Sequence, residues 1–360
     1  MNRNGDIRKD VPLVSVCTIT YNQSPYIRQC LDGILKQETN FIFEMVVGED
    51  ESTDGTREIC VEYEGKYPEK IQLILRSQSE ADRKDFVSPA IYNWVSTLQA
   101  CKGKYIAICE GDDYWHNPHK LQTQVDFMES HPEYSMCHSE TNYNDMVNNR
   151  FVRNDHASSK RRHDQDNVSE AHVCGDYVVR TCTIIARTEQ VKRIAKEHLG
   201  EFSRFIAGDM ITVFHLSLLG RVHYMEESLA TYRRVPGSVT GLDDSSRRLK
   251  FIFAAATERL YFCDHYNLSR ACLDAVLKMD LSVLLGLCLK CRSKSSLSQI
   301  YKMYKGQPFS GVPRILYFST TAYWLACGIW TAFRLLSTQK RVWCRFIQGS
   351  RKFVRRNHDV

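Results

Sequence analysis

Acidic residues gather in two short segments of this sequence, and each directly follows a run typical of a buried strand. The first, Gly48-Glu-Asp-Glu-Ser-Thr-Asp-Gly-Thr56, follows Phe43–Val47. The second, Glu110-Gly-Asp-Asp-Tyr-Trp115, follows Tyr105–Cys109. Crowded carboxylates repel one another unless a positive charge compensates them. A divalent cation does so, and Mg²⁺ or Mn²⁺ prefers carboxylate oxygens together with phosphate. The two segments therefore predict a nucleoside diphosphate held through a metal ion.

The first 140 residues alternate strand and helix patterns, which places both acidic segments at one edge of a sheet. This alternation predicts a parallel sheet with helices on both faces, and ligands of such sheets bind beyond the carboxyl ends of the strands. The predicted strands are Leu13–Thr20, Phe43–Val47, Ile71–Leu75 and Tyr105–Cys109, and the predicted helices are Pro25–Gln37, Asp54–Tyr63, Pro89–Ala100 and Pro118–Glu129.

The pattern is less regular after residue 140. Asn144–Glu170 is polar and poor in large apolar residues, so it is interpreted either as a surface loop or as a lid that contacts an acceptor. Beyond it we expect strands at Tyr177–Ala186 and Ser228–Arg233, and helices at Glu189–Leu199, Asp209–Leu219, Phe251–Tyr266 and Ala271–Leu289.

Both acidic segments also have a purely structural interpretation. Ser52, Thr53 and Asp54 are good N-caps for the helix that follows, and Gly55 eases the turn. Capping does not explain the three acids that precede them, Glu49–Glu51. Glu110–Asp113 could be a solvated turn, although its position after an apolar strand weakens that interpretation.

Four pieces, in this order along the chain, carry a family resemblance. They are Val14-Ser-Val-Cys-Thr-Ile-Thr-Tyr-Asn22, the Gly48–Thr56 segment, Gly103-Lys-Tyr-Ile-Ala-Ile-Cys-Glu-Gly-Asp-Asp-Tyr-Trp115, and Gly208-Asp209 followed by Tyr232-Arg233 and Pro236-Gly-Ser238. With them the sequence resembles the family 2 glycosyltransferases, from about residue 12 to 240. The resemblance implies the GT-A fold, a Rossmann-like, mixed and mostly parallel sheet flanked by helices. It also implies an inverting transfer of a sugar from a nucleoside diphosphate.

The resemblance assigns the residues of the nucleotide-sugar site. Thr20 and Tyr21 would line the nucleotide pocket at the end of the first strand. Asp50 matches the acid that hydrogen-bonds the base, which favours a UDP-sugar, and Glu49 lies beside it. Glu110 takes the place of the first acid of the family's Asp-x-Asp motif, which approaches the ribose. The longer side chain of glutamate is a departure that leaves its contact open.

The metal and the general base follow from the same resemblance. Asp112 corresponds to the metal-binding acid, and Asp113 lies next to it, so both are predicted to hold a divalent cation, Mn²⁺ or Mg²⁺. Asp209 matches the general base, because a carboxylate must take the acceptor hydroxyl's proton as the new bond forms. A cation would stabilise the charge that grows on the diphosphate. Since Gly208-Asp209 also begins a predicted helix, capping is an alternative role.

One position departs from the pattern in a way that bears on phosphate binding. Many family members carry a histidine two residues after the matching Tyr-Arg, and this sequence has Val235 there. Arg233 or Arg234 could neutralise the phosphates instead, because a guanidinium binds oxygen pairs well.

Charge and cysteine content exclude other classes of protein. The net charge of +6 comes from the chain after residue 313, where nine basic residues face one acid. The rest is slightly acidic, so a nucleic-acid-binding body is excluded. The 14 cysteines are scattered without regular spacing, which favours reduced thiols and a cytoplasmic setting. The polar N-terminus, Met1–Asp10, shows no signal peptide.

The last part of the chain is interpreted as a location signal. Ile315–Phe333 carries no charge, and eight Arg or Lys residues follow it. An interfacial helix with a basic flank, a membrane span, and a soluble helix all remain open. We therefore predict a catalytic domain at 1–245, a helical extension at 246–313, and an apolar helix with a basic tail at 314–360. The first of these alternatives places the enzyme at the cytoplasmic face of the inner membrane.

We therefore interpret the sequence as a glycosyltransferase that acts on a glycan or lipid-linked acceptor in cell-surface polysaccharide or glycolipid synthesis. One alternative is a sugar nucleotidyltransferase, which would ordinarily show a glycine-rich loop after the first strand. Here that turn is Tyr21-Asn-Gln-Ser-Pro25. The other alternative is a non-catalytic module that binds a glycan or a partner on the same fold. The presence of Asp112 and Asp209 argues against it.

Overall fold

The computed structural model describes residues 11–77, 85–155, 168–238, 244–291 and 293–304. The chain divides after Asp280 into two compact units, and the predicted boundary at residue 245 lies inside the first. Within the described ranges, no helix combines the length and apolar character needed to cross a membrane. The apolar helix and basic tail predicted at 314–360 lie outside the described residues and stay a prediction.

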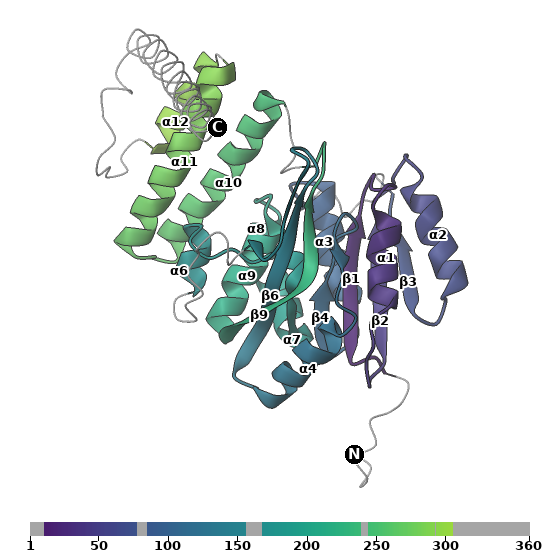
Figure 1. The fold of residues 1–360 in the computed structure, drawn as a ribbon. Coiled ribbons are helices and arrows are strands. Elements are labelled where there is room, and N and C mark those ends of the chain that lie inside the picture. The colour runs from purple at the N-terminus through teal and green to yellow at the C-terminus, as the bar shows by residue number, and fades with distance from the viewer. Residues whose placement is uncertain (1–10, 78–84, 156–167, 239–243, 292, 305–360) are drawn as a thin grey trace, which may run out of the picture. The chain divides into compact units, whose positions relative to one another are not determined.

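A mixed sheet forms the centre of the first unit (Figure 1). Its strand order is β3-β2-β1-β4-β8-β6-β9-β5, with β7 paired to β6. The strands β1 to β4 are parallel, as are β6 and β9, whereas β8, β5 and β7 run antiparallel to their neighbours. The bounds are β1 Val14–Thr20, β2 Phe43–Glu49, β3 Ile71–Leu75, β4 Tyr105–Ile108, β5 Tyr114–Trp115, β6 Tyr134–Asp145, β7 Arg150–Val152, β8 Ile185–Arg187 and β9 Arg221–Arg234. The predicted mixed, mostly parallel sheet is confirmed.

Helices cover both faces of this sheet because its strands alternate their side chains between two apolar cores. In β2, Met45 and Val47 pack with α1, α2 and α4, whereas Val46 packs with α3, α7 and α9. The helices are α1 Ile27–Leu35, α2 Thr56–Lys66, α3 Pro89–Ala100, α4 Lys120–Ser130, α6 Val168–Val173, α7 Thr188–Glu197, α8 Leu199–Phe202, α9 Gly208–Leu219, α10 Ser245–His265, α11 Arg270–Cys291 and α12 Lys294–Tyr304. The helices and strands predicted before residue 130 are confirmed within two residues at most ends, as are the three helices predicted at 189–199, 209–219 and 271–289.

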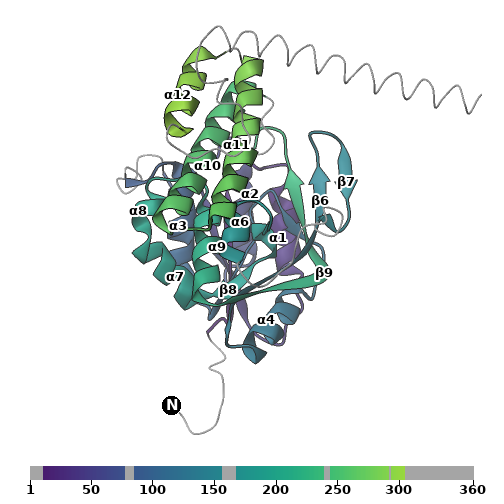
Figure 2. The same ribbon diagram turned by 90° about the vertical axis from the view of Figure 1, so that its left-hand side faces the viewer.

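Strand β6 was not predicted, because many of its buried side chains are polar. Several of these polar groups find a partner across the sheet. The Thr141 hydroxyl donates to the Ala230 carbonyl (2.9 Å), and Glu140 accepts from the Tyr224 hydroxyl (2.6 Å). Since buried polar groups that are hydrogen-bonded cost little, a central strand can lack the apolar pattern. β6 ends inside the predicted 144–170 loop, which also contains β7 and the start of α6 (Figure 2).

The strand predicted at Tyr177–Ala186 is wrong over most of its length. Thr181–Thr183 forms a 3₁₀ turn, and only Ile185 and its neighbours pair, as β8. The Thr183 hydroxyl donates to the Arg180 carbonyl (2.6 Å), and Gln124 Nε2 donates to the Thr183 carbonyl (2.8 Å). These local and side-chain bonds take the backbone groups that a strand ladder would use. Conversely, the strand predicted at Ser228–Arg233 is the end of the longer β9.

Candidate active site

A cavity of about 620 Å³ opens beyond the carboxyl ends of β1, β2 and β4. The starts of α3 and α9 and the chain after β9 complete its wall. Seven of the ten predicted site residues line it: Thr20, Tyr21, Asp50, Glu110, Asp112, Asp113 and Asp209. They come from four separate parts of the chain, so the fold converges on the residues that the sequence singled out.

Strand register brings the nucleotide-side residues together. Thr20 is opposite Glu49 in the parallel β1–β2 pair, and the Asp50 amide donates to the Thr20 carbonyl (3.1 Å). The Thr20 hydroxyl donates to Gln23 Oε1 (2.8 Å). Gly111 packs directly against this pair, since a Cβ there would lie 2.5 Å from Gln23 Oε1 and 2.7 Å from the Thr20 hydroxyl oxygen. Only glycine fits at this position of the acidic turn.

The acidic turn after β4 holds three carboxylates away from bulk water. Burial raises the pKa of Glu110 to about 7, and the charges of Asp112 and Asp209 add to the effect. Burial also raises the pKa of Asp112 to about 6, against the opposing charge of Arg233. The pKa of Asp113 lies well above its ordinary value, because of burial and then of the other two acids. Each pKa moves in the direction expected of acids that lack sufficient positive charge.

Arg233 holds this turn in place from β9. Its backbone amide donates to Asp113 Oδ1 (2.7 Å), and its guanidinium donates to the Asp112 carbonyl (2.8 Å) and to Gln29. The guanidinium carbon also lies 4.3 Å from the centre of the Tyr114 ring. With 5% of its surface exposed, Arg233 is a buried support of the acidic turn. It does not belong to the cavity wall described above.

The turn fits a divalent cation in chemical terms. Glu110 Oε2 is buried, and within the described part of the chain it has no hydrogen-bond partner. Asp112 faces the cavity, whereas Asp113 is 1% exposed and accepts from the Arg233 amide. Asp112 is therefore the better placed of the two predicted ligands, and Asp113 is placed to hold the turn. The remaining positions around a cation would go to phosphate oxygens and water, as Mg²⁺ and Mn²⁺ prefer.

Glu49 and Arg234 lie beside the site and engage other protein groups. Glu49 is fully buried, accepts from the Ser52 amide (2.7 Å) and forms an ion pair with Arg57. These contacts shape the loop that presents Asp50 to the cavity. Arg234 forms an ion pair with Asp145 at the end of β6, with Nη1 3.2 Å from Oδ2. Direct contact of either residue with a nucleotide sugar stays a prediction.

Asp209 lies in the first turn of α9, with its side chain exposed and on the cavity wall. The N-cap of α9 is Ala207, and no side chain caps the helix. Asp209 therefore does not cap α9, and the alternative role considered for it from the sequence is wrong. Glu258 of α10 lies behind this turn, where its Oε2 accepts from the Ala207 amide (3.2 Å).

The sequence did not single out Asn93, which lines the cavity from α3. Its Nδ2 donates to the Gly48 carbonyl (2.8 Å), and its Oδ1 accepts from Arg76 Nε (2.8 Å). A Cβ on Gly48 would lie 2.2 Å from Asn93 Oδ1. A polar residue inside the apolar run of a predicted helix was the available signal. Other polar wall residues that the sequence analysis did not assign to the site are Gln23, Ser88 and Thr181, together with Tyr232 and Ser238, which it named only as part of the family motif.

Comparison with a solved structure defines the class of fold. The structure of S. aureus TarS 1-349 in complex with UDP-GlcNAc matches with a TM-score of 0.53 and 20% sequence identity. The match covers 82% of this chain and 81% of that one, and it confirms the GT-A fold.

Sequence comparison then gives the family. The model for glycosyl transferase family 2 matches residues 15–187. The putative teichuronic acid biosynthesis glycosyltransferase TuaG of Bacillus subtilis is 28% identical over 70% of this chain and 90% of its own length. An uncharacterized protein of Mycobacterium tuberculosis is 40% identical over 124 residues. These residues are 34% of this chain and 34% of that protein, so the chain matches only about a third of its length. Residues 15–187 therefore belong to glycosyl transferase family 2.

Proposed function

We propose that this protein is an inverting glycosyltransferase that moves a sugar from a UDP-sugar to an acceptor hydroxyl. One observation carries the proposal. Asp50, Asp112 and Asp209, which come from three separate segments of the chain, line a single cavity of about 620 Å³ at the carboxyl edge of the sheet. This volume is within the range of small-molecule sites. The reaction needs acids of this kind to bind the nucleobase, to hold the cation on the diphosphate and to take the proton from the acceptor.

The chain's own residues bind and orient the donor. Asp50 accepts hydrogen bonds from the uracil, and Thr20 and Tyr21 form the wall beside it. Asp112 faces the diphosphate, on a turn fixed by Arg233. A bound Mn²⁺ or Mg²⁺ would supply positive charge to the leaving diphosphate. Because the acidic turn is largely removed from water, electrostatic stabilisation there is stronger than in bulk solvent.

Asp209 takes the proton from the acceptor hydroxyl as the oxygen attacks the anomeric carbon. This role fits an exposed carboxylate that faces the cavity and caps no helix. Attack from the face opposite the diphosphate inverts the anomeric centre.

The relatives support a polysaccharide as the product. The name of TuaG refers to teichuronic acid biosynthesis, and the TarS structure contains UDP-GlcNAc. We therefore propose a UDP-sugar donor and a cell-surface glycan or lipid-linked acceptor. Membrane contact through the basic tail at 314–360, at the cytoplasmic face, belongs to the same proposal.

The Asp209→Asn variant tests the proposal most directly. UDP release from a panel of UDP-sugars is measured with Mn²⁺ or Mg²⁺ and compared with the parent. We expect at least a ~100-fold loss of turnover, the usual contribution of a general base, with donor binding by thermal shift unchanged. Asp126→Asn, on the exposed face of α4, is the matched control. Turnover retained in Asp209→Asn, or no metal-dependent UDP release by the parent, would refute the proposal.

A further inference from the structure

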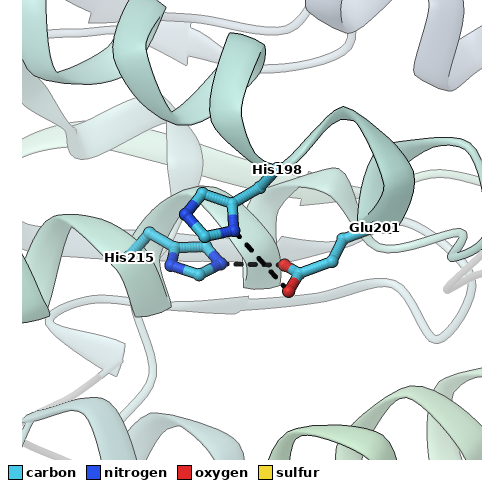
Figure 3. Close-up of side chains that lie close together, drawn as sticks. All are labelled: His198, Glu201 and His215. Carbon is cyan, nitrogen blue, oxygen red and sulfur yellow. Dashed lines mark hydrogen bonds and ion pairs between the residues drawn. The ribbon is translucent and has the colours of Figure 1, made fainter. Parts of the chain in front are cut away.

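Two histidines and a glutamate from three places in the chain meet where α8 packs against α9, the helix that carries Asp209 (Figure 3). His198 lies between α7 and α8, Glu201 is in α8, and His215 is in α9. One possible ligand atom of each residue lies within 4.8 Å of the other two. None of these three residues lines the cavity of the candidate active site.

The contacts within this cluster are tight and mostly buried. His215 Nε2 lies 2.8 Å from Glu201 Oε2, and His198 Nδ1 lies 3.7 Å from Glu201 Oε1. The two imidazole rings stack with their centres 3.5 Å apart. The side chains of His215 and Glu201 are 4% and 8% exposed, whereas His198 is 28% exposed. Figure 3 shows both rings directed at the same carboxylate.

A hydrogen-bonded pair would account for His215 and Glu201 but not for His198. The 3.7 Å separation of His198 Nδ1 from the carboxylate exceeds the length of a hydrogen bond. A neutral imidazole turned toward a carboxylate at this distance has a lone pair available for a metal ion.

We propose that His198, Glu201 and His215 form a zinc site, separate from the cation site of the donor. Two imidazoles with one carboxylate are a ligand set that Zn²⁺ favours. Imidazole nitrogen binds Zn²⁺ in preference to Mg²⁺ or Mn²⁺, which prefer oxygen ligands. Ligand atoms about 2.0–2.1 Å from a tetrahedral Zn²⁺ lie about 3.3 Å apart. The separations that compare with this value are 2.8 Å, from His215 Nε2 to Glu201 Oε2, and 3.7 Å, from His198 Nδ1 to Glu201 Oε1, so side-chain shifts would bring the three ligands around one ion.

Tyr266 completes the surroundings of the site. Its hydroxyl donates to Glu201 Oε1 and lies 3.4 Å from His215 Nε2. Such a bond orients a metal-binding carboxylate from the outer shell. Burial alone would raise the pKa of Glu201, but the bonds from His215 and Tyr266 outweigh it and lower that pKa. The partly exposed ring of His198 gives an ion a route from solvent.

The bound ion would join α8 to α9, and Asp209 is in the first turn of α9. Zinc at this place is therefore structural, and it stabilises the helix that presents the proposed base. Because zinc binding at this site needs neither the sugar donor nor the acceptor, it can be tested without any transfer reaction.

The first experiment titrates the full chain, stripped with a chelator and free of nucleotide, with Zn²⁺ alone. We expect one equivalent to bind, and Zn²⁺ at 100 times its Kd to raise Tm by about 4–5 °C. Co²⁺ should give the visible absorption of a tetrahedral site with nitrogen and oxygen ligands. No stoichiometric binding, or thiolate-to-cobalt absorption that places the ion on cysteines, would overturn the proposal.

The second experiment compares two histidine variants. His198→Gln should weaken Zn²⁺ binding at least about 100-fold, because it removes one of three ligands. His119→Gln is the matched control, since His119 is exposed and lies 3.9 Å from a single acid, Glu38. Asp112→Asn should bind Zn²⁺ like the parent, which separates this site from the donor's cation. Equal affinity in His198→Gln and the parent would overturn the proposal.

Discussion

Replacement of Arg233 by methionine tests the support of the acidic turn. The variant keeps an unbranched stem but loses the guanidinium, which donates to the Asp112 carbonyl and to Gln29 and lies over Tyr114. Charge-assisted hydrogen bonds contribute about 1.5–3 kcal/mol each, and a desolvated cation–π contact about 1–2 kcal/mol. After allowance for the packing of methionine, we expect a loss of about 3 kcal/mol.

This loss converts into a measurable shift of Tm. At about 2.1 cal/mol/K per residue, a compact unit of 280 residues has an unfolding entropy of about 0.6 kcal/mol/K. Arg233→Met should therefore lower Tm by about 5 °C in thermal unfolding of the ligand-free protein. Arg234→Met is the adjacent control. Its ion pair with Asp145, at 3.2 Å, contributes about 1 kcal/mol or less, which is a shift under 2 °C.

Two results would refute this account of Arg233. Equal shifts of Tm in Arg233→Met and Arg234→Met would show that the buried contacts contribute nothing special. An unchanged Tm with donor affinity at least tenfold weaker would instead support direct phosphate binding, as the sequence pattern predicts for both arginines.

Two further changes probe the neighbourhood of the cavity. Gly111→Ala would force a Cβ against Gln23 and Thr20, so we expect a stability loss of about 1–3 kcal/mol and weaker donor binding. Gly65→Ala, with open space around it in α2, should instead gain about 0.5–1 kcal/mol, and urea unfolding compares the two. Burial, and then the charge of Asp209, raises the pKa of Glu258 from its ordinary value of 4.5 to about 9. Between these two pH values the folded chain keeps a proton on Glu258 that the unfolded chain loses. Stability therefore falls as pH rises through that range, by at most about 1.4 kcal/mol per unit. Glu258→Gln removes this fall, so the free energy of unfolding of the variant should rise relative to the parent from pH 5 to pH 8. Parallel curves of stability against pH for the two proteins would contradict the raised pKa of Glu258.

The sequence predicted most of the fold where apolar periodicity and turn residues agree. The strands before residue 110 and their helices are local features, since each is set by its own pattern of buried side chains. The sequence did not predict β6 because its buried Glu140 and Thr141 bind partners that lie more than 80 residues away. The strand predicted at Tyr177–Ala186 was wrong for the opposite reason. Its composition favours a strand, but local hydrogen bonds at Thr183 override this preference.

The order of the acidic motifs determined the family and named seven residues of the cavity wall, because the chemistry of a site depends on residue types at strand ends. Tertiary structure alone decided what each polar group contacts. Glu49 and Arg233 have the residue types of ligand contacts, yet the fold engages them as supports of the loops that carry Asp50 and Asp112. The meeting of His198 and His215 at Glu201 is likewise absent from the sequence pattern, since it requires α8 and α9 to pack together. Local spacing specifies elements, whereas contacts between distant side chains depend on how those elements pack.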